Sequence, residues 1–149
     1  MAGMISPRTP FSNVVRLRRV LRMLKGTAWW VDAHFGRRAL EDLASEIDPE
    51  HVVEMRILTG DAESVVDTKS WGDFERFRAE MSAIGIRSEW RVDMRGARDW
   101  HDRWIADAEF AWNVPPVNTL FKNDYSEIFP ATERPPLDQW WARSTVRVQ

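Results

Sequence analysis

Apolar residues recur every three or four positions in three stretches of the chain, which is the spacing of a helix that buries one face. The first predicted helix begins at Ser12, which with Asn13 is a candidate N-cap, and ends before Gly26. A second helix is predicted over residues 37–47. The third, over 71–85, has the most regular apolar face, formed by Trp71, Phe74, Phe77, Met81 and Ile84.

Shorter apolar stretches between and after these helices predict five strands. Residues 27–33 and 51–60 are apolar on both alternations, as expected of strands that are covered on two faces. Residues 86–92 alternate strictly, so we expect one face of this strand to meet solvent. Two further strands, over 100–107 and 109–114, are predicted to form a hairpin.

This order of helices and strands predicts a mixed α/β fold: a mainly parallel sheet flanked by helices, with a C-terminal antiparallel hairpin. The 149 residues suit a single domain. Within it we distinguish a basic helix over 1–26, the α/β domain over 27–121 and a Pro- and Trp-rich tail over 122–149. The prolines after Asn113 indicate irregular chain, although the tail has the pattern of a short helix and an edge strand over 137–148.

Ligands of open α/β sheets bind beyond the carboxyl ends of the strands. The residues expected at that edge are Ala33, His34, Thr59 and Gly60.

The formal net charge of −2 gives no overall case for nucleic-acid or membrane binding, but the distribution of charge is uneven. No acidic residue precedes Asp32, so the N-terminal segment is a local basic patch. The alternative interpretation of this N-terminal segment is an ordinary amphipathic helix, which packs its apolar side on the sheet and exposes its arginines to water. The basic residues are Arg8, Arg16, Arg18, Arg19, Arg22 and Lys25.

The chain contains no cysteine, which excludes disulfides, thiolate catalysis and cysteine-ligated metal. It has no apolar run long enough to span a bilayer, and its first residues lack the apolar core of a signal peptide. We therefore expect a cytoplasmic protein, and we predict neither a metal site nor a cofactor.

Nine tryptophans are many for this length. We expect them to fill the space between sheet and helices, and the alternative is a surface on which nucleic-acid bases stack. Exposed Trp140 and Trp141 are further candidates, as anchors for a protein partner.

The segment DWHDRWIAD, residues 99–107, mixes charged and aromatic residues. In an extended strand His101, Arg103 and Asp107 share one face, on which imidazole and guanidinium can hold a phosphate while the carboxylate orients one of them. The alternative is a solvated strand face with ordinary surface charges.

The runs WWVDAHFGRRALEDL, VVEMRILTG, FERFRAEMSAIGIRSEWRV and HDRWIADAEFAWNVPPVNTLF together resemble a phospholipase D-like half-domain. They are most similar to the degenerate branch that forms the C-terminal domain of some MIT-domain proteins. The resemblance places His101 on the family's nucleophilic histidine, Arg103 on its lysine and Asn118 near its asparagine. It implies that these three residues bind phosphate and that Asp107 supports them.

The chain departs from the family signature, because arginine replaces lysine, Asp107 lies one position early and Pro115 and Pro116 replace Gly-Ser. The resemblance therefore implies a non-catalytic domain that binds a phosphate-bearing ligand, either a phospholipid head group or nucleic acid, or a protein partner. One alternative is a homodimeric phosphodiesterase or nuclease with His101 as nucleophile. Another is a small adaptor of a bacterial multi-protein system.

Overall fold

The computed structural model describes residues 3–5, 10–32, 35–60, 68–95, 103–114, 126–131 and 133–147. In these residues eight strands form one sheet in the order β1-β7-β6-β5-β2-β3-β4-β8. The strands are β1 Gly3–Ile5, β2 Gly26–Asp32, β3 Val52–Gly60, β4 Arg87–Asp93, β5 Arg103–Ala106, β6 Ala111–Val114, β7 Ser126–Pro130 and β8 Thr145–Val146. The helices are α1 Pro10–Met23, α2 Arg37–Glu46, α3 Thr68–Ala83 and α6 Leu137–Arg143.

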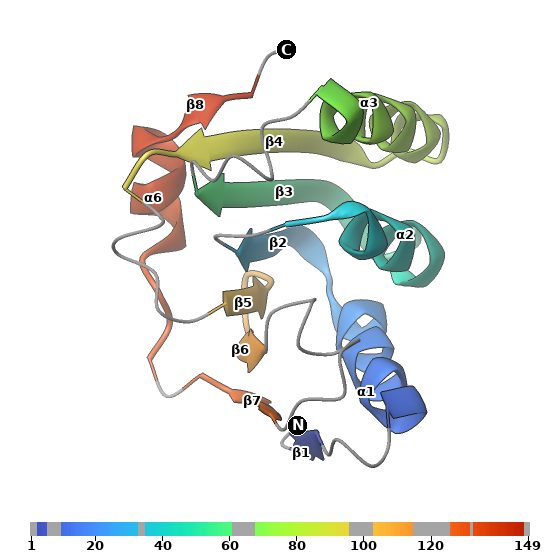
Figure 1. The fold of residues 1–149 in the computed structure, drawn as a ribbon, viewed down its shortest axis with the longest axis vertical. Helices are drawn as coiled ribbons and strands as arrows, with labels where there is room; N and C mark the ends of the chain where they lie inside the picture. The colour runs from blue at the N-terminus through green and yellow to red at the C-terminus, as the bar shows by residue number, and fades with distance from the viewer. Residues whose placement is uncertain are drawn as a thin grey trace.

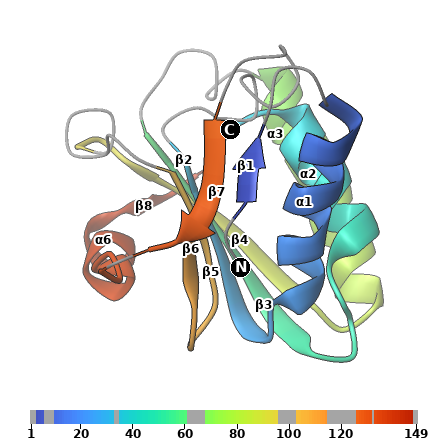
Figure 2. The same cartoon turned by 90° about the horizontal axis from the view of Figure 1, so that it is seen from below.

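The sheet has helices on both faces, which confirms the predicted mixed α/β fold (Figure 1). α1, α2 and α3 lie side by side on one face, and the short α6 lies on the other (Figure 2). β2, β3 and β4 are parallel to one another. The remaining strands extend this parallel centre by antiparallel pairing on both sides.

Two glycines at positive φ fix the ends of predicted elements. Gly26, with φ of 71°, begins β2 two residues after the end of α1, and Gly85, with φ of 86°, follows α3. The N–H groups of Gly85 and Ile86 donate to the carbonyls of Ser82 and Met81, which satisfies the last turn of α3. α1 itself begins at Pro10, two residues before the predicted start, because proline suits the first turn of a helix.

The residues after position 122 contribute strands to the sheet and a helix to one of its faces. The predicted short helix and edge strand are confirmed as α6 and β8. β7 was not predicted, and it places Pro130 at its last position, opposite Trp112, where the ladder ends.

Two apolar clusters hold the layers together. The larger lies between the sheet and α1–α3, and the smaller lies between the sheet and α6. The expected role of the tryptophans as packing residues is confirmed for those that the structure describes, since each belongs to or packs against one of the clusters. They are Trp29, Trp30, Trp71, Trp90, Trp104, Trp112, Trp140 and Trp141.

The strand β4 has the predicted alternation, with Ser88, Trp90 and Val92 buried. The strand β5 is instead covered on both faces, because Ile105 packs in the larger cluster and Trp104 against the smaller one. Within the described chain, no helix combines the length and the apolar character that crossing a bilayer requires.

Candidate functional site

The carboxyl ends of β2, β3 and β4 meet at one edge of the sheet, where ligands of such sheets bind. Thr59 and Gly60 lie there as predicted, at the end of β3. Two buried aspartates that were not predicted as site residues end the neighbouring strands, Asp32 on β2 and Asp93 on β4. Each is the last residue of its strand and follows a buried valine, Val31 or Val92, and a carboxylate at that position was the available signal.

Both aspartates are paired with arginines that come from later in the chain. The Nε of Arg103 lies 3.2 Å from Oδ1 of Asp32, and the Nε of Arg143 lies 2.7 Å from Oδ2 of Asp93. The side chain of Asp32 is 1% exposed and that of Arg103 is 19% exposed. Arg103, predicted as a phosphate ligand, therefore joins the start of β5 to the end of β2 by an ion pair.

Asp107 lies at the opposite end of β5 from Arg103. Its carboxylate accepts hydrogen bonds from the backbone N–H groups of Lys25, Glu109 and Phe110, at 3.1, 2.9 and 2.8 Å. It thereby closes the β5–β6 turn and ties that turn to the segment between α1 and β2. Arg103 begins β5 and Asp107 directly follows it, so the two side chains are engaged at opposite ends of the strand.

The remaining predicted site residues, His101 and Asn118, lie outside the described residues, as do Ala33 and His34. Among the residues that the structure does describe, no three or more His, Asp or Glu side chains gather as metal ligands do.

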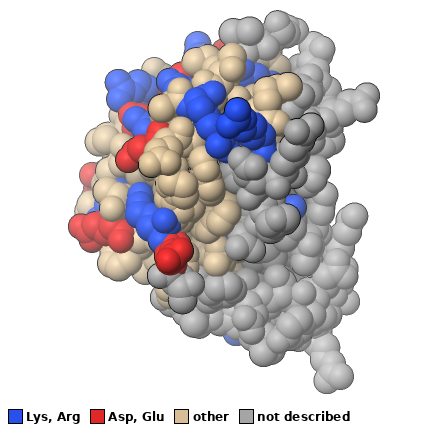
Figure 3. All heavy atoms as spheres, turned by 90° about the vertical axis from the view of Figure 1, so that its left-hand side faces the viewer, with Lys and Arg blue, Asp and Glu red and all other residues tan. Residues whose placement is uncertain are grey.

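The face that carries α6 combines charges of both signs. Glu54 on β3 pairs with Arg56 and with Arg87, and Arg91 pairs with Glu89. Burial acts to raise the pKa of Glu54, but the hydrogen bonds from Arg56 and Arg87 outweigh it and hold that pKa below its usual value. Figure 3 views the side where α6 and the ends of β3 and β4 lie, and in its described part red side chains lie beside some of the blue ones. The charges of these pairs therefore offset one another.

The helix α1 has a different balance of charge. Its carboxylate partners come from α2, which lies beside it (Figure 1). The Nε of Arg18 lies 3.3 Å from Oδ1 of Asp42, and Arg22 pairs with Glu46. Burial raises the pKa of the Asp42 carboxyl, the neighbouring Glu46 and Glu41 raise it further, and Arg18 opposes the rise.

Arg19 and Lys25 complete this surface. Both are exposed, and neither has a carboxylate within ion-pair distance in the described part of the chain. α1 itself contains no acidic residue. We call the group of Arg18, Arg19, Arg22 and Lys25 the α1 basic surface. It carries more positive charge than Asp42 and Glu46 can balance.

Comparison with known proteins bears on the fold. No family model matches the chain, and no curated protein matches it. Among solved structures it is similar to TrmBL2, an archaeal chromatin protein with a novel mode of DNA binding. That similarity has a TM-score of 0.58 at 9% sequence identity, over 97% of this chain and 54% of TrmBL2. The chain thus spans about half the length of TrmBL2, and the likeness shows the fold.

The expected membership of the phospholipase D-like family is therefore wrong, and so are the functions derived from it. The resemblance rested on His101, Arg103 and Asn118, with Asp107 one position early. Of these, Arg103 meets Asp32 and Asp107 closes a turn. The motif identities behind the resemblance were few, and the two of these residues that the structure describes make an ion pair between strands and hydrogen bonds that close a turn.

Proposed function

We propose that this chain is a DNA-binding domain that holds the phosphate backbone of duplex DNA with the α1 basic surface. The observation that carries the proposal is the surplus of positive charge on the α1 basic surface, where Arg19 on α1 and Lys25 just after it are exposed without a carboxylate partner in the described chain. Exposed cations of this kind neutralise phosphates and release the counterions that surround DNA.

The likeness to TrmBL2 supports the same function. TrmBL2 binds DNA, and this chain shares its fold over 97% of its own length. A fold supports many functions, so the likeness raises the case for DNA without naming the residues. A DNA-binding role also accords with the expected cytoplasmic location.

The proposal concerns backbone contacts, which position a protein on DNA and carry no sequence information. The described tryptophans are engaged in the two apolar clusters, so the proposal relies on cations and not on base stacking by these tryptophans. We therefore expect binding that is independent of base sequence and strongly weakened by salt.

Fluorescence anisotropy with a labelled duplex, repeated across salt concentrations, tests the proposal. We expect the double variant Arg19→Ala with Lys25→Ala to bind more weakly. The slope of log affinity against log salt is expected to fall by about 2, roughly one for each phosphate that the variant no longer neutralises.

A matched control separates a local effect from a change in net charge. Arg37 and Arg76 lie together in the groove between α2 and α3, and each is already paired with a carboxylate. The double variant Arg37→Ala with Arg76→Ala removes the same charge, and we expect it to keep the salt slope of the parent protein. If both variants lose affinity equally, or if the parent protein does not bind duplex DNA at low salt, the proposal is wrong.

A further inference from the structure

Two arginines of α1 and two carboxylates of α2 form a connected set of ion pairs. The Nε of Arg18 lies 3.3 Å from Oδ1 of Asp42, and one turn later Arg22 pairs with Glu46. Both pairs join residues that are 24 positions apart, so a step of one turn along α1 matches a step of one turn along α2. The Nε of Arg18 also lies 3.8 Å from Oε1 of Glu46, which connects the two pairs.

The carboxylates of this set lie beneath the arginines. The side chains of Asp42 and Glu46 are 7% and 13% exposed, whereas those of Arg18 and Arg22 are 39% and 58% exposed. α1 and α2 lie side by side, and the ion pairs lie between them (Figure 1). A phosphate that approaches α1 from solvent therefore meets the guanidinium groups first.

The buried carboxylate of Asp42 depends on Arg18. Its Oδ1 accepts from Arg18, whereas its Oδ2 is buried and has no hydrogen-bond partner among the described residues. Burial raises the pKa of this carboxyl, and Arg18 opposes the rise. Taking the cation away from a buried carboxylate is costly, because the charge that remains is uncompensated. Arg18 is therefore held on the protein more firmly than an exposed arginine without a partner.

We propose that Asp42 and Glu46 determine how tightly the α1 basic surface binds DNA, because they compete with phosphates for its two paired arginines. This inference rests on the proposed function. A guanidinium whose charge is already offset by a carboxylate contributes less to the neutralisation of phosphates and to the release of counterions. In the parent protein, phosphates are thus contacted mainly by the other two cations of the surface.

Replacing each carboxylate by its amide tests the competition at nearly constant size. We expect Asp42→Asn and Glu46→Gln each to release one arginine, so that the slope of log affinity against log salt steepens by about 0.9. Over the tenfold range between about 0.1 M and about 1 M salt, that change corresponds to an affinity about eightfold higher at the lower concentration. Fluorescence anisotropy with a labelled duplex measures both quantities.

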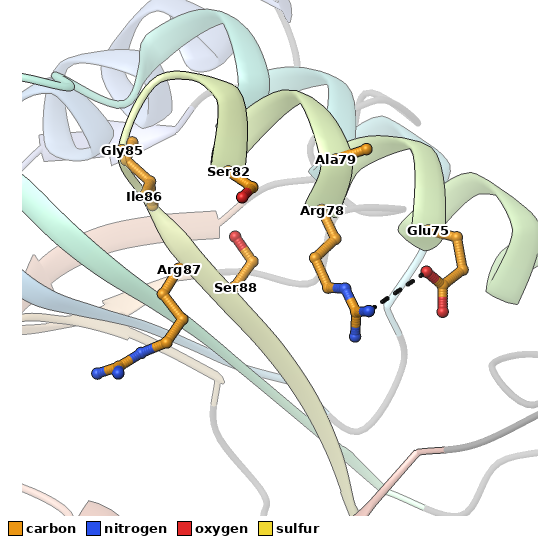
Figure 4. Close-up of a pocket in the computed structure, with 8 residues that line it drawn as sticks. All are labelled: Glu75, Arg78, Ala79, Ser82, Gly85, Ile86, Arg87 and Ser88. Atoms are coloured by element: carbon orange, nitrogen blue, oxygen red, sulfur yellow. Dashed lines mark ion pairs between the residues drawn. The ribbon is translucent and has the colours of Figure 1, made fainter.

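A matched control removes a carboxylate from an ion pair on another helix. In the groove between α3 and β4, Oε2 of Glu75 lies 3.8 Å from Nη2 of Arg78 (Figure 4). Glu75→Gln changes the net charge by the same amount as Asp42→Asn, but the cation that it releases lies on α3, which α2 separates from α1 (Figure 1). We expect this control to keep the salt slope of the parent protein.

A double variant tests whether the gain in affinity depends on the arginine. We expect the gain of Asp42→Asn to disappear when Arg18→Ala is added, since no guanidinium then remains for the carboxylate to hold. Circular dichroism establishes that each variant is folded. If Asp42→Asn does not fold, Glu46→Gln with Arg22→Ala makes the same test, because Glu46 is the last residue of α2 and less deeply buried.

Two results overturn the inference. One is an affinity of the carboxylate variants that rises no more than that of Glu75→Gln, and the other is a gain for Asp42→Asn that persists without Arg18. If the parent protein binds duplex DNA and either result is found, this inference fails and the proposed function stands. If neither the parent protein nor the carboxylate variants bind at low salt, both fail. Binding by the carboxylate variants alone supports this inference and contradicts the proposed function of the parent protein.

Discussion

Arg103 illustrates how a charged residue in a strand acquires its role from a distant part of the chain. Its spacing from His101 and Asp107 suggested a phosphate ligand, but its Nε lies against the carboxylate of Asp32, which is 71 residues away. A carboxylate that is almost completely buried requires a cation or several hydrogen-bond donors, because desolvation of its charge is costly. The ion pair therefore fixes the carboxyl edge of β2.

We predict that Arg103→Ala lowers the free energy of unfolding by about 3 kcal/mol, because it leaves Asp32 without this ion pair at a buried position. Arg103→Lys retains the charge and is expected to lose less. Urea unfolding followed by tryptophan fluorescence measures both. A decrease below about 0.5 kcal/mol for Arg103→Ala contradicts the structural role of the ion pair, since it is the effect of an ordinary surface residue.

The ionisation of Glu54 makes the free energy of unfolding depend on pH. Its pKa is lower in the folded chain than the usual value of 4.5, as the bonds from Arg56 and Arg87 outweigh the effect of burial. A carboxyl with a lowered pKa adds stability above its unfolded pKa, and that stability is lost as pH falls through the folded pKa. We therefore predict that Glu54→Gln flattens the fall in unfolding free energy below about pH 4.5.

Urea unfolding at several pH values between about 3 and 6 measures this difference. The control is Glu41→Gln, which removes the same charge from an exposed position on α2. Equal slopes for Glu54→Gln and the parent protein would count against the role of Glu54.

At the scale of elements, α6 is the only helix of the described chain on its face of the sheet, and Trp141 makes several of the contacts that hold it there. Trp141 meets Trp29 edge to face at 5.4 Å between ring centroids. The guanidinium groups of Arg56 and Arg91 lie 5.1 and 4.3 Å from its ring centre, and Arg91 also donates to its carbonyl. A helix of seven residues has little stability of its own, so these contacts hold it.

We predict that Trp141→Ala costs about 3 kcal/mol and raises hydrogen exchange in α6 and in the neighbouring part of β3, because truncating a large buried ring leaves a cavity between helix and sheet. Hydrogen–deuterium exchange with mass spectrometry measures the exchange of each segment separately. The exposed Gln139→Ala on the same helix serves as control and is expected to change little. Increased exchange spread evenly over the protein would contradict a local role.

The helices and strands differed in how accurately the sequence predicted them. α2 and α3 were predicted within a few residues, since a helix that packs one face on a sheet repeats its apolar positions. β7 was missed because its residues give no alternation, and it is held by pairing with β1 and β6 from distant parts of the chain. Strand formation of this kind depends on neighbours in space.

At the scale of the molecule, local sequence patterns predicted the fold class, whereas they did not predict the function. The mixed α/β arrangement followed from the order of the elements. The expected phosphate site rested on four motif residues, of which Arg103 and Asp107 join parts of the sheet and His101 and Asn118 lie outside the described chain. The basic character of α1 was visible in the sequence. How much of it remains unbalanced became clear once α2 was seen to supply Asp42 and Glu46.

Local periodicity was thus sufficient for the helices, the central strands, the fold class and the basic helix, because each depends on residues close together in the chain. Contacts between distant segments across the sheet could not be predicted from local periodicity. The ion pair of Arg103 with Asp32 and the hydrogen bond from Lys25 to Asp107 each join segments separated by tens of residues. DWHDRWIAD shows both sides of this division: in its described part Trp104 and Ile105 do lie on opposite faces of the sheet, but Arg103 and Asp107 are engaged at opposite ends of β5.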